Sequence, residues 1–124
     1  MARILVVEDN DSLRELIGEV LQRQGYSVVE VENGAVAFET LRTDAQFDAI
    51  ISDIYMPDMD GLRLIRLVKH HFPAIPIVIA TAYLYQIKHA LALGAAQALF
   101  KPFTNSQLVE TVRAVVQKPA LAAR

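Results

Sequence analysis

The sequence of 124 residues is long enough for one domain, and its 53% hydrophobic and 21% charged residues are typical of a globular protein. A net charge of −2, from 12 basic and 14 acidic side chains, gives no electrostatic reason to expect nucleic acid or membrane as a direct partner. Cysteine is absent and no apolar run approaches the ~18 residues that span a bilayer, so we expect a cytoplasmic protein without disulfides or thiolate metal sites.

Five short apolar runs alternate with segments of helical spacing. Each run is too short for a helix and most are rich in branched or aromatic residues, so we expect five strands. In chain order the runs are Ile4–Val7, the half-polar Ser27–Val31, Ala49–Ile51, Ile77–Ala80 and Ala98–Phe100.

The segment after the first run carries apolar residues at the spacing of a single helix face. Asp11 is expected to cap the N-terminus of this helix, and Gly25 is expected just past its C-terminus. The apolar stripe consists of Leu13, Leu16, Ile17, Val20 and Leu21.

The next two helices are expected after the second and third strands. One is predicted to begin at the N-cap Asn33, and the other to cover residues 61–72 and end before Pro73. Their inward residues are predicted to be Val36, Ala37 and Leu41 in the first, and Leu62, Ile65 and Val68 in the second.

The last two helices follow the fourth and fifth strands. The first of them is expected over residues 85–93, with Gly94 at its end. The second begins with the capping-box pattern "TNSQ" and is predicted to bury Leu108, Val112 and Val115. Pro119 is predicted to end it, leaving residues 119–124 as a C-terminal tail after a domain of residues 1–118.

This alternation of strand and helix, repeated five times, predicts the fold class. Continuous apolar strands separated by helices favour a parallel sheet that is covered on both faces. Because crossovers between parallel strands are right-handed, we expect an α/β doubly wound sheet. Ligands of such sheets bind outside the carboxyl ends of the strands.

Polar residues stand at the predicted carboxyl ends of four strands. Glu8 and Asp9 follow the first strand and Asp53 follows the third. The fourth strand ends in Thr81 and the fifth is followed by Lys101. Since these ends meet at one edge of the sheet, we expect the side chains to lie close together.

The residue types in this set indicate a phosphoryl site. Three neighbouring carboxylates repel one another unless cations offset them, and the candidate cations are Lys101 and a hard divalent ion. Oxygen-only ligands favour Mg²⁺ or a similar ion, which often also binds phosphate oxygens. A carboxylate can act as a nucleophile and form an acyl phosphate, so the sequence predicts a Mg²⁺-dependent aspartyl-phosphate site.

Four segments in this order match a known family: "ILVVEDND", "DIYMPDMDG", "IVIATA" and "KPF". Over residues 3–117 the chain resembles the response regulator receiver domain, of the chemotaxis-type single-domain kind. The resemblance implies a flavodoxin-like, five-stranded parallel sheet of order 2-1-3-4-5 with five helices. It also implies a two-component phosphorelay protein with no separate output domain in this chain.

The resemblance further implies how a phosphoryl group and Mg²⁺ are held. Asp53 is expected as the phosphoacceptor and, with Asp9, as a direct metal ligand. Glu8 is expected to act largely through water, and the backbone carbonyl of Tyr55 to supply a further ligand. We therefore expect Mg²⁺ as the cofactor.

Thr81 and Lys101 complete the implied site. The Thr81 hydroxyl is expected to move to the phosphoryl group, and Lys101 to pair with the acid and then with a phosphoryl oxygen. The implied donor is a phosphohistidine on a sensor histidine kinase or histidine phosphotransfer protein, and the implied target is a downstream protein effector. The chain is then not an enzyme beyond its own phosphorylation and dephosphorylation, and it is a monomer or weak dimer.

The sequence departs from the family at the position three residues before the lysine. An aromatic is usual there, but this chain has Ala98, which puts the usual coupling between threonine and aromatic in doubt. The segment between Thr81 and Gly94 also looks about two residues shorter than in the family. Tyr55 and Tyr83 are expected to flank the phosphoryl group, and we hypothesise that their rings slow its hydrolysis.

Two other interpretations stay open. One is a degenerate receiver that binds partners independently of phosphate. The presence of Ala98 in place of the usual aromatic leaves this interpretation open. The other is a phosphatase of the haloacid dehalogenase type, but its Asp-x-Asp pattern is missing because "DIY" begins at Asp53. Asp58 and Asp60 are interpreted as loop and helix-start residues, and His70 and His71 as solvated residues at a helix end.

Overall fold

The structure is a computed structural model that describes residues 2–122, with side-chain surroundings for residues 2–116. Strands and helices alternate along the chain and the sheet contains five parallel strands in the order β2-β1-β3-β4-β5. The elements are β1 (Arg3–Val7), α1 (Asp11–Arg23), β2 (Ser27–Val31), α2 (Gly34–Thr43), β3 (Ala49–Asp53), α3 (Gly61–His71), β4 (Ile77–Thr81), α4 (Leu84–Leu93), β5 (Gln97–Phe100) and α5 (Asn105–Ala122). The predicted doubly wound fold and its strand order are confirmed.

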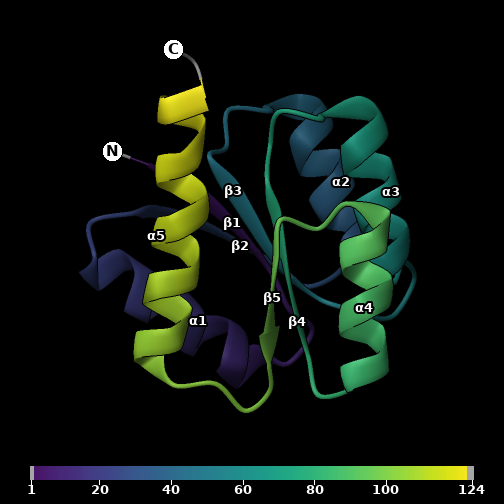
Figure 1. The fold of residues 1–124 in the computed structure, drawn as a ribbon, viewed down its shortest axis with the longest axis horizontal. Coiled ribbons are helices and arrows are strands. Elements are labelled where there is room, and N and C mark those ends of the chain that lie inside the picture. The colour runs from purple at the N-terminus through teal and green to yellow at the C-terminus, as the bar shows by residue number, and fades with distance from the viewer. Residues whose placement is uncertain (1, 123–124) are drawn as a thin grey trace.

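The helices cover the two faces of the sheet unequally. Figure 1 shows α1 and α5 on one face and α2, α3 and α4 on the other. Alternate residues of each strand supply the two cores, because successive side chains point to opposite faces. Leu5 and Ile79 belong to the same core as Leu64 of α3, whereas Ile4 and Val78 belong to the core beneath α1 and α5.

Side-chain caps mark the starts of α1, α2, α3 and α5. Asn33 Oδ1 accepts a hydrogen bond from the Val36 amide at 2.9 Å, as predicted for the start of α2. The predicted capping box of α5 forms between Thr104 and Gln107, in both directions. The cap of α1 was predicted one residue late: Asn10 accepts from the Leu13 amide at 2.9 Å, and Asp11 is the first helical residue.

Leu62 is half-buried and packs against the core as predicted, next to the fully buried Leu64, which was not singled out in the sequence. Two predictions about the helices were wrong in detail. Leu16 and Val36 were expected in the core but are 49% and 40% exposed, because each lies at the edge of its helix's apolar stripe. The backbone of α5 continues through Pro119 to Ala122; a proline removes one helical hydrogen bond, and here the helix tolerates that loss.

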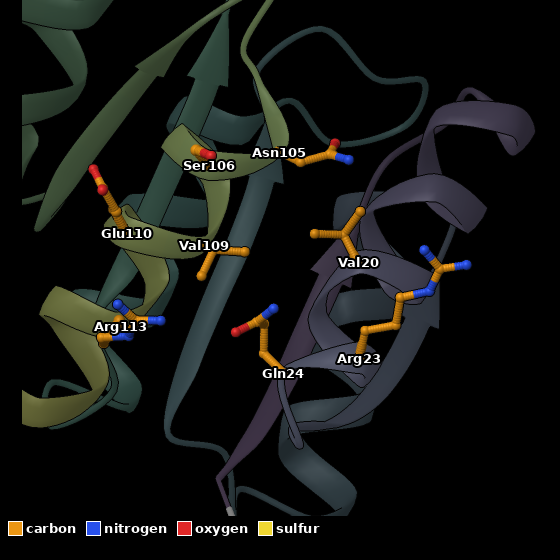
Figure 2. Close-up of a pocket in the computed structure, with 8 residues that line it drawn as sticks. All are labelled: Val20, Arg23, Gln24, Asn105, Ser106, Val109, Glu110 and Arg113. Atoms are coloured by element: carbon orange, nitrogen blue, oxygen red, sulfur yellow. The ribbon is translucent and has the colours of Figure 1, made fainter.

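Among the described residues, no helix has both the length and the apolar character needed to cross a bilayer. A hollow of about 430 Å³ opens between α1 and α5, lined by Arg23, Asn105 and Arg113 among others (Figure 2). None of the predicted site residues lines it. The chemistry expected from the sequence therefore has to be sought at the strand ends.

Candidate functional site

The sheet register brings the predicted site residues to one edge. Val7 is paired with Ser52, so Glu8 comes next to Asp53 on the neighbouring strand end. Asp53 is paired with Ala80, one residue before Thr81, and Thr81 is paired with Phe100, one residue before Lys101. All lie at carboxyl ends of strands, as expected for this fold.

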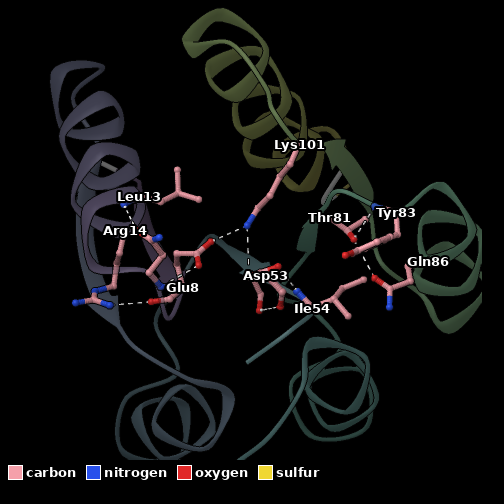
Figure 3. A network of polar contacts seen from close by, with 11 residues as sticks. Glu8, Leu13, Arg14, Asp53, Ile54, Thr81, Tyr83, Gln86 and Lys101 are labelled. Carbon is pink, nitrogen blue, oxygen red and sulfur yellow. Dashed lines mark hydrogen bonds and ion pairs between the residues drawn. The ribbon is translucent and has the colours of Figure 1, made fainter. Parts of the chain in front are cut away.

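Lys101 joins two of the carboxylates across the sheet edge. Its Nζ lies 3.0 Å from Glu8 Oε1 and 3.3 Å from Asp53 Oδ2 (Figure 3). Burial lowers the pKa of Lys101, but the charges of Asp53 and Glu8 more than offset this, so its pKa lies above the ordinary lysine value. The side chain is therefore a fixed positive charge beside Asp53 at neutral pH.

Glu8 is the most deeply buried of the acids, at 3% exposed. Its Oε2 accepts a hydrogen bond from the Asn10 amide at 3.1 Å, and Arg14 donates to its backbone carbonyl at 2.8 Å. Burial raises the pKa of Glu8 and the neighbouring charge of Asp53 adds to this. The Asn10 and Lys101 contacts oppose the rise without cancelling it. The charged form of Glu8 is thus held at a cost that another cation would relieve.

Asp53 is held at the last residue of β3 by its own backbone and by the loop that follows. Its Oδ1 accepts from the Ile54 amide at 2.7 Å, which leaves Oδ2 toward Lys101. Gly61 donates its amide to the Ile54 carbonyl at 2.8 Å. A Cβ on Gly61 would collide with the Asp53 carbonyl oxygen and come within 2.8 Å of Ile54 Cα, so only glycine fits here.

The acids form a set that fits a small divalent cation. Glu8, Asp9 and Asp53 each offer one oxygen, and these oxygens lie within 4.8 Å of one another. Mg²⁺ in proteins is bound by oxygen donors, usually one or two carboxylates together with waters and phosphate oxygens. The part of the set contributed by the Tyr55 carbonyl stays a prediction.

Thr81 lies on the adjacent strand end but its hydroxyl is engaged elsewhere. The residue is 2% exposed, and its Oγ1 donates to Gln86 Oε1 at 2.9 Å and accepts from the Tyr83 amide at 3.2 Å. Figure 3 shows these contacts on the opposite side of Asp53 from the Lys101–Glu8 pair. Gln86 was not predicted from the sequence; its signal was a polar residue four positions before the buried Ala90, on the inner face of α4.

Three exposed tyrosines gather beside the site. The hydroxyls of Tyr55 and Tyr85 lie 3.2 Å apart, and this hydrogen bond raises the pKa of Tyr85. The ring of Tyr83 meets that of Tyr55 edge-on at 5.4 Å and that of Tyr85 at 5.9 Å. Tyr55 and Tyr83 were singled out in the sequence; Tyr85 was missed because its contact joins the first turn of α4 to the loop after β3.

The four side chains interpreted as structural lie in the loop after β3 and in α3: Asp58, Asp60, His70 and His71. Asp60 caps α3 by accepting from the Arg63 amide at 2.8 Å, and Asp58 adopts a positive φ of 69° in the loop. His70 and His71 lie in the last turn of α3 and are exposed. None of these four belongs to the cluster of Glu8, Asp9 and Asp53.

Comparison with known proteins agrees with this arrangement. The family described as response regulator receiver domain matches residues 4–113. The chain belongs to the response regulator receiver domain family. It is therefore a receiver domain of two-component signalling. The family matched over residues 4–113 is thus not that of the alternative, a haloacid dehalogenase phosphatase.

Individual relatives differ in how much of their length this receiver covers. The response regulator FleR of Pseudomonas aeruginosa is 36% identical over 113 residues, which are 90% of this chain but 24% of FleR. Chemotaxis protein CheY1 of Helicobacter pylori is 35% identical over 119 residues, covering 92% of this chain and 96% of CheY1.

A solved structure of the response regulator TrrA from Thermotoga maritima, in complex with Mg²⁺ and BeF, has a similar fold. It is 32% identical, with a TM-score of 0.86 over 93% of this chain and 99% of TrrA.

Proposed function

We propose that this receiver accepts a phosphoryl group on Asp53 and thereby changes its affinity for a protein effector. The observation that carries the proposal is the position of the Lys101 ammonium, 3.3 Å from Asp53 Oδ2 and 3.0 Å from Glu8 Oε1. An ionised carboxylate beside a fixed positive charge can attack phosphorus without a general base.

The proposed donor is a phosphohistidine on a sensor histidine kinase or a histidine phosphotransfer protein. An Asp53 oxygen forms the new P–O bond while the P–N bond to the donor imidazole breaks, and that imidazole keeps the electron pair and takes up a proton. Lys101 holds a phosphoryl oxygen as negative charge builds on it. Hydrolysis later transfers the phosphoryl group to water and restores the Asp53 carboxylate.

Glu8, Asp9 and Asp53, with the Tyr55 carbonyl, would hold Mg²⁺ in this proposal. When bound, Mg²⁺ neutralises the phosphoryl oxygens and the clustered acids together. Two observations support this assignment: the oxygen set within 4.8 Å, and the complex of the similar protein TrrA with Mg²⁺ and BeF. Glu8 is buried against Lys101, which fits a role through water better than direct ligation.

Incubation with Mg²⁺ and acetyl phosphate, followed by intact-protein mass spectrometry, tests the acceptor. Wild type is expected to gain one phosphoryl group, and Asp53→Ala none. Asp58→Asn is the matched control, because it also removes a carboxylate near the site but one that has no contact with Lys101 among the described side chains. Chelation of Mg²⁺ should slow the gain strongly.

A wild-type protein that gains no mass with any phosphodonor would contradict the proposal and favour the degenerate receiver. An equal gain in Asp53→Ala and wild type would show that another residue accepts the phosphoryl group and would contradict the assignment of Asp53. Effector binding is then tested by comparing which proteins bind the phosphorylated and unphosphorylated forms.

A further inference from the structure

The hydroxyl of Thr81 is fully committed to the start of α4. Its one proton goes to Gln86 Oε1 at 2.9 Å, and it accepts the Tyr83 amide at 3.2 Å. Tyr83 is the N-cap residue of α4, and its own side chain makes no capping hydrogen bond in the described structure. The hydroxyl at the end of β4 therefore acts as a cap for the next helix.

The side chain of Gln86 is buried, so water has little access to its amide group. It is 6% exposed in the first turn of α4 and shares a buried face with Ala90. A buried amide oxygen needs a donor, and the donor supplied here is the Thr81 hydroxyl. Because the Gln86 atom that faces Oγ1 is the amide oxygen, which can only accept, the Thr81 hydroxyl is the donor.

This hydrogen bond prevents the Thr81 hydroxyl from donating to a phosphoryl group on Asp53 at the same time. A hydroxyl has one proton, so Thr81 can donate either to Gln86 or to a phosphoryl oxygen on Asp53. In the described structure Thr81 bonds only toward α4, whereas Lys101 already faces Asp53. Delivery of the hydroxyl to the phosphoryl group requires release from Gln86.

We propose that Gln86 is a positioning residue that holds the Thr81 hydroxyl on α4 until a phosphoryl group on Asp53 draws it away. This inference rests on the proposed function of Asp53. Release removes the only hydrogen bond described for the Gln86 side chain, together with the contact to the Tyr83 amide, so the first turn of α4 must rearrange.

The coupling runs through the helix itself, which suits a chain with Ala98 in β5. Ala98 is half-buried and offers no ring that could follow the hydroxyl. The nearest aromatic of the same strand, Phe100, is 46% exposed at the strand end. The Thr81–Gln86 hydrogen bond links the site to an output element without either side chain.

The variant Gln86→Met tests the holding role, because methionine keeps the length and removes the acceptor. The control Lys88→Met introduces methionine at an exposed position of the same helix, α4. The first readout is the Thr81 methyl signal in NMR spectra of protein labelled at threonine methyl groups. Without ligand, the signal of Gln86→Met is expected to move toward its position in beryllofluoride-bound wild type, and that of Lys88→Met to stay.

The second readout is the beryllofluoride affinity of the folded variants at constant Mg²⁺. Gln86→Met is expected to bind about fivefold tighter than wild type, since no hydrogen bond must be given up. If methionine disturbs folding, Gln86→Asn repeats the test, because a side chain one methylene shorter cannot reach the hydroxyl. A purely structural role for Gln86 would lower stability and leave both readouts at wild-type values.

The outcomes separate the two proposals. An unmoved Thr81 signal and unchanged affinity in Gln86→Met or Gln86→Asn, with a normal wild-type response, overturn the role of Gln86 alone. A wild type that shows no Asp53-dependent response to beryllofluoride overturns the proposed function, and the release step with it. Movement of the Thr81 signal together with tighter binding supports both.

Discussion

The candidate site has two sides of different character. The charged side consists of Glu8, Asp53 and Lys101, which are buried or half-buried and joined by ion pairs of 3.0 and 3.3 Å. The hydroxyl side consists of Thr81 and Gln86 at the start of α4, beside exposed tyrosines. On the first side Lys101 holds Glu8 and Asp53 together; on the second the described hydrogen bonds of Thr81 lead away from Asp53.

The difference indicates which side of the site has to change its hydrogen bonds when the domain changes state. For the proposed phosphoryl transfer, the ion pairs of the charged side already place Lys101 beside Asp53, so little reorganisation is required there. At the hydroxyl side two hydrogen bonds have to be exchanged, and their partners belong to a helix on the surface. In the proposed function, the phosphoryl chemistry thus belongs to the charged side and the rearrangement of α4 to the hydroxyl side.

Removal of the lysine should have the largest effect if the charged side carries the chemistry. Lys101→Met is expected to slow phosphorylation by acetyl phosphate about 100-fold, because a charge-stabilising donor at the reacting group is lost. Rates are measured by intact mass against time. Lys69→Met, an exposed lysine on α3, should keep the wild-type rate, and an equal loss in both variants would contradict the prediction.

The backbone that positions Asp53 is the next test. Gly61→Ala is expected to lower the free energy of unfolding by roughly 1–3 kcal/mol, because the added methyl meets the backbone of Asp53 and Ile54. Urea denaturation gives the value. Gly18→Ala is the control: its methyl meets only the flexible end of Glu30, so alanine in this helix should be neutral or stabilising.

The tyrosines test whether the hydroxyl side also restricts the access of water to a phosphoryl group on Asp53. Tyr55→Asn combined with Tyr83→Ala is expected to shorten the lifetime of the aspartyl phosphate several-fold, because rings in edge-on contact beside the site obstruct attacking water. The decay is followed after the phosphodonor is removed. Tyr85→Phe, which deletes only the hydroxyl contact with Tyr55, is the milder comparison. An unchanged lifetime in the double variant would show that the rings serve another purpose.

The smallest effect concerns the pH dependence of stability. The pKa of Glu8 is raised above its ordinary value of 4.5 by burial and by Asp53. The folded state therefore binds the Glu8 proton more tightly than the unfolded state, and stability is lost as pH rises from 4.5 through the folded pKa. Without Mg²⁺, Glu8→Gln should lack this loss, so its stability relative to wild type should increase across that range.

Urea titrations from acidic to neutral pH in chelator measure the difference between the two proteins. Glu15→Gln, which makes the same change at an exposed position of α1 without a described ion pair, should follow wild type. A constant difference between Glu8→Gln and wild type would contradict the assigned direction of the pKa shift.

The fold was accessible from sequence because each element carried a strong local signal. Continuous apolar runs and helical stripes placed the strands and helices, and the side chains at the strand ends followed from topology. The errors lie where two local signals compete. Asn10 and Asp11 are both good caps, and only the bond from the Leu13 amide to Asn10 decides between them.

The site was less completely predictable because part of it depends on loop geometry. Glu8, Asp9, Asp53 and Lys101 come together through strand register, which the periodicity implied. The engagement of Thr81 by Gln86 depends on the angle at which α4 begins, and that angle is set by the short connection from β4. Periodicity in sequence contains no measure of this angle.

The clustering of tyrosines also gives the domain an intrinsic optical probe. The sequence has four tyrosines and no tryptophan, so no indole emission masks the phenols. Tyr55, Tyr83 and Tyr85 lie in mutual contact at the site, while Tyr26 precedes β2 at the opposite edge of the sheet. Near-ultraviolet fluorescence of the unlabelled protein should therefore report chiefly on the environment of the candidate site.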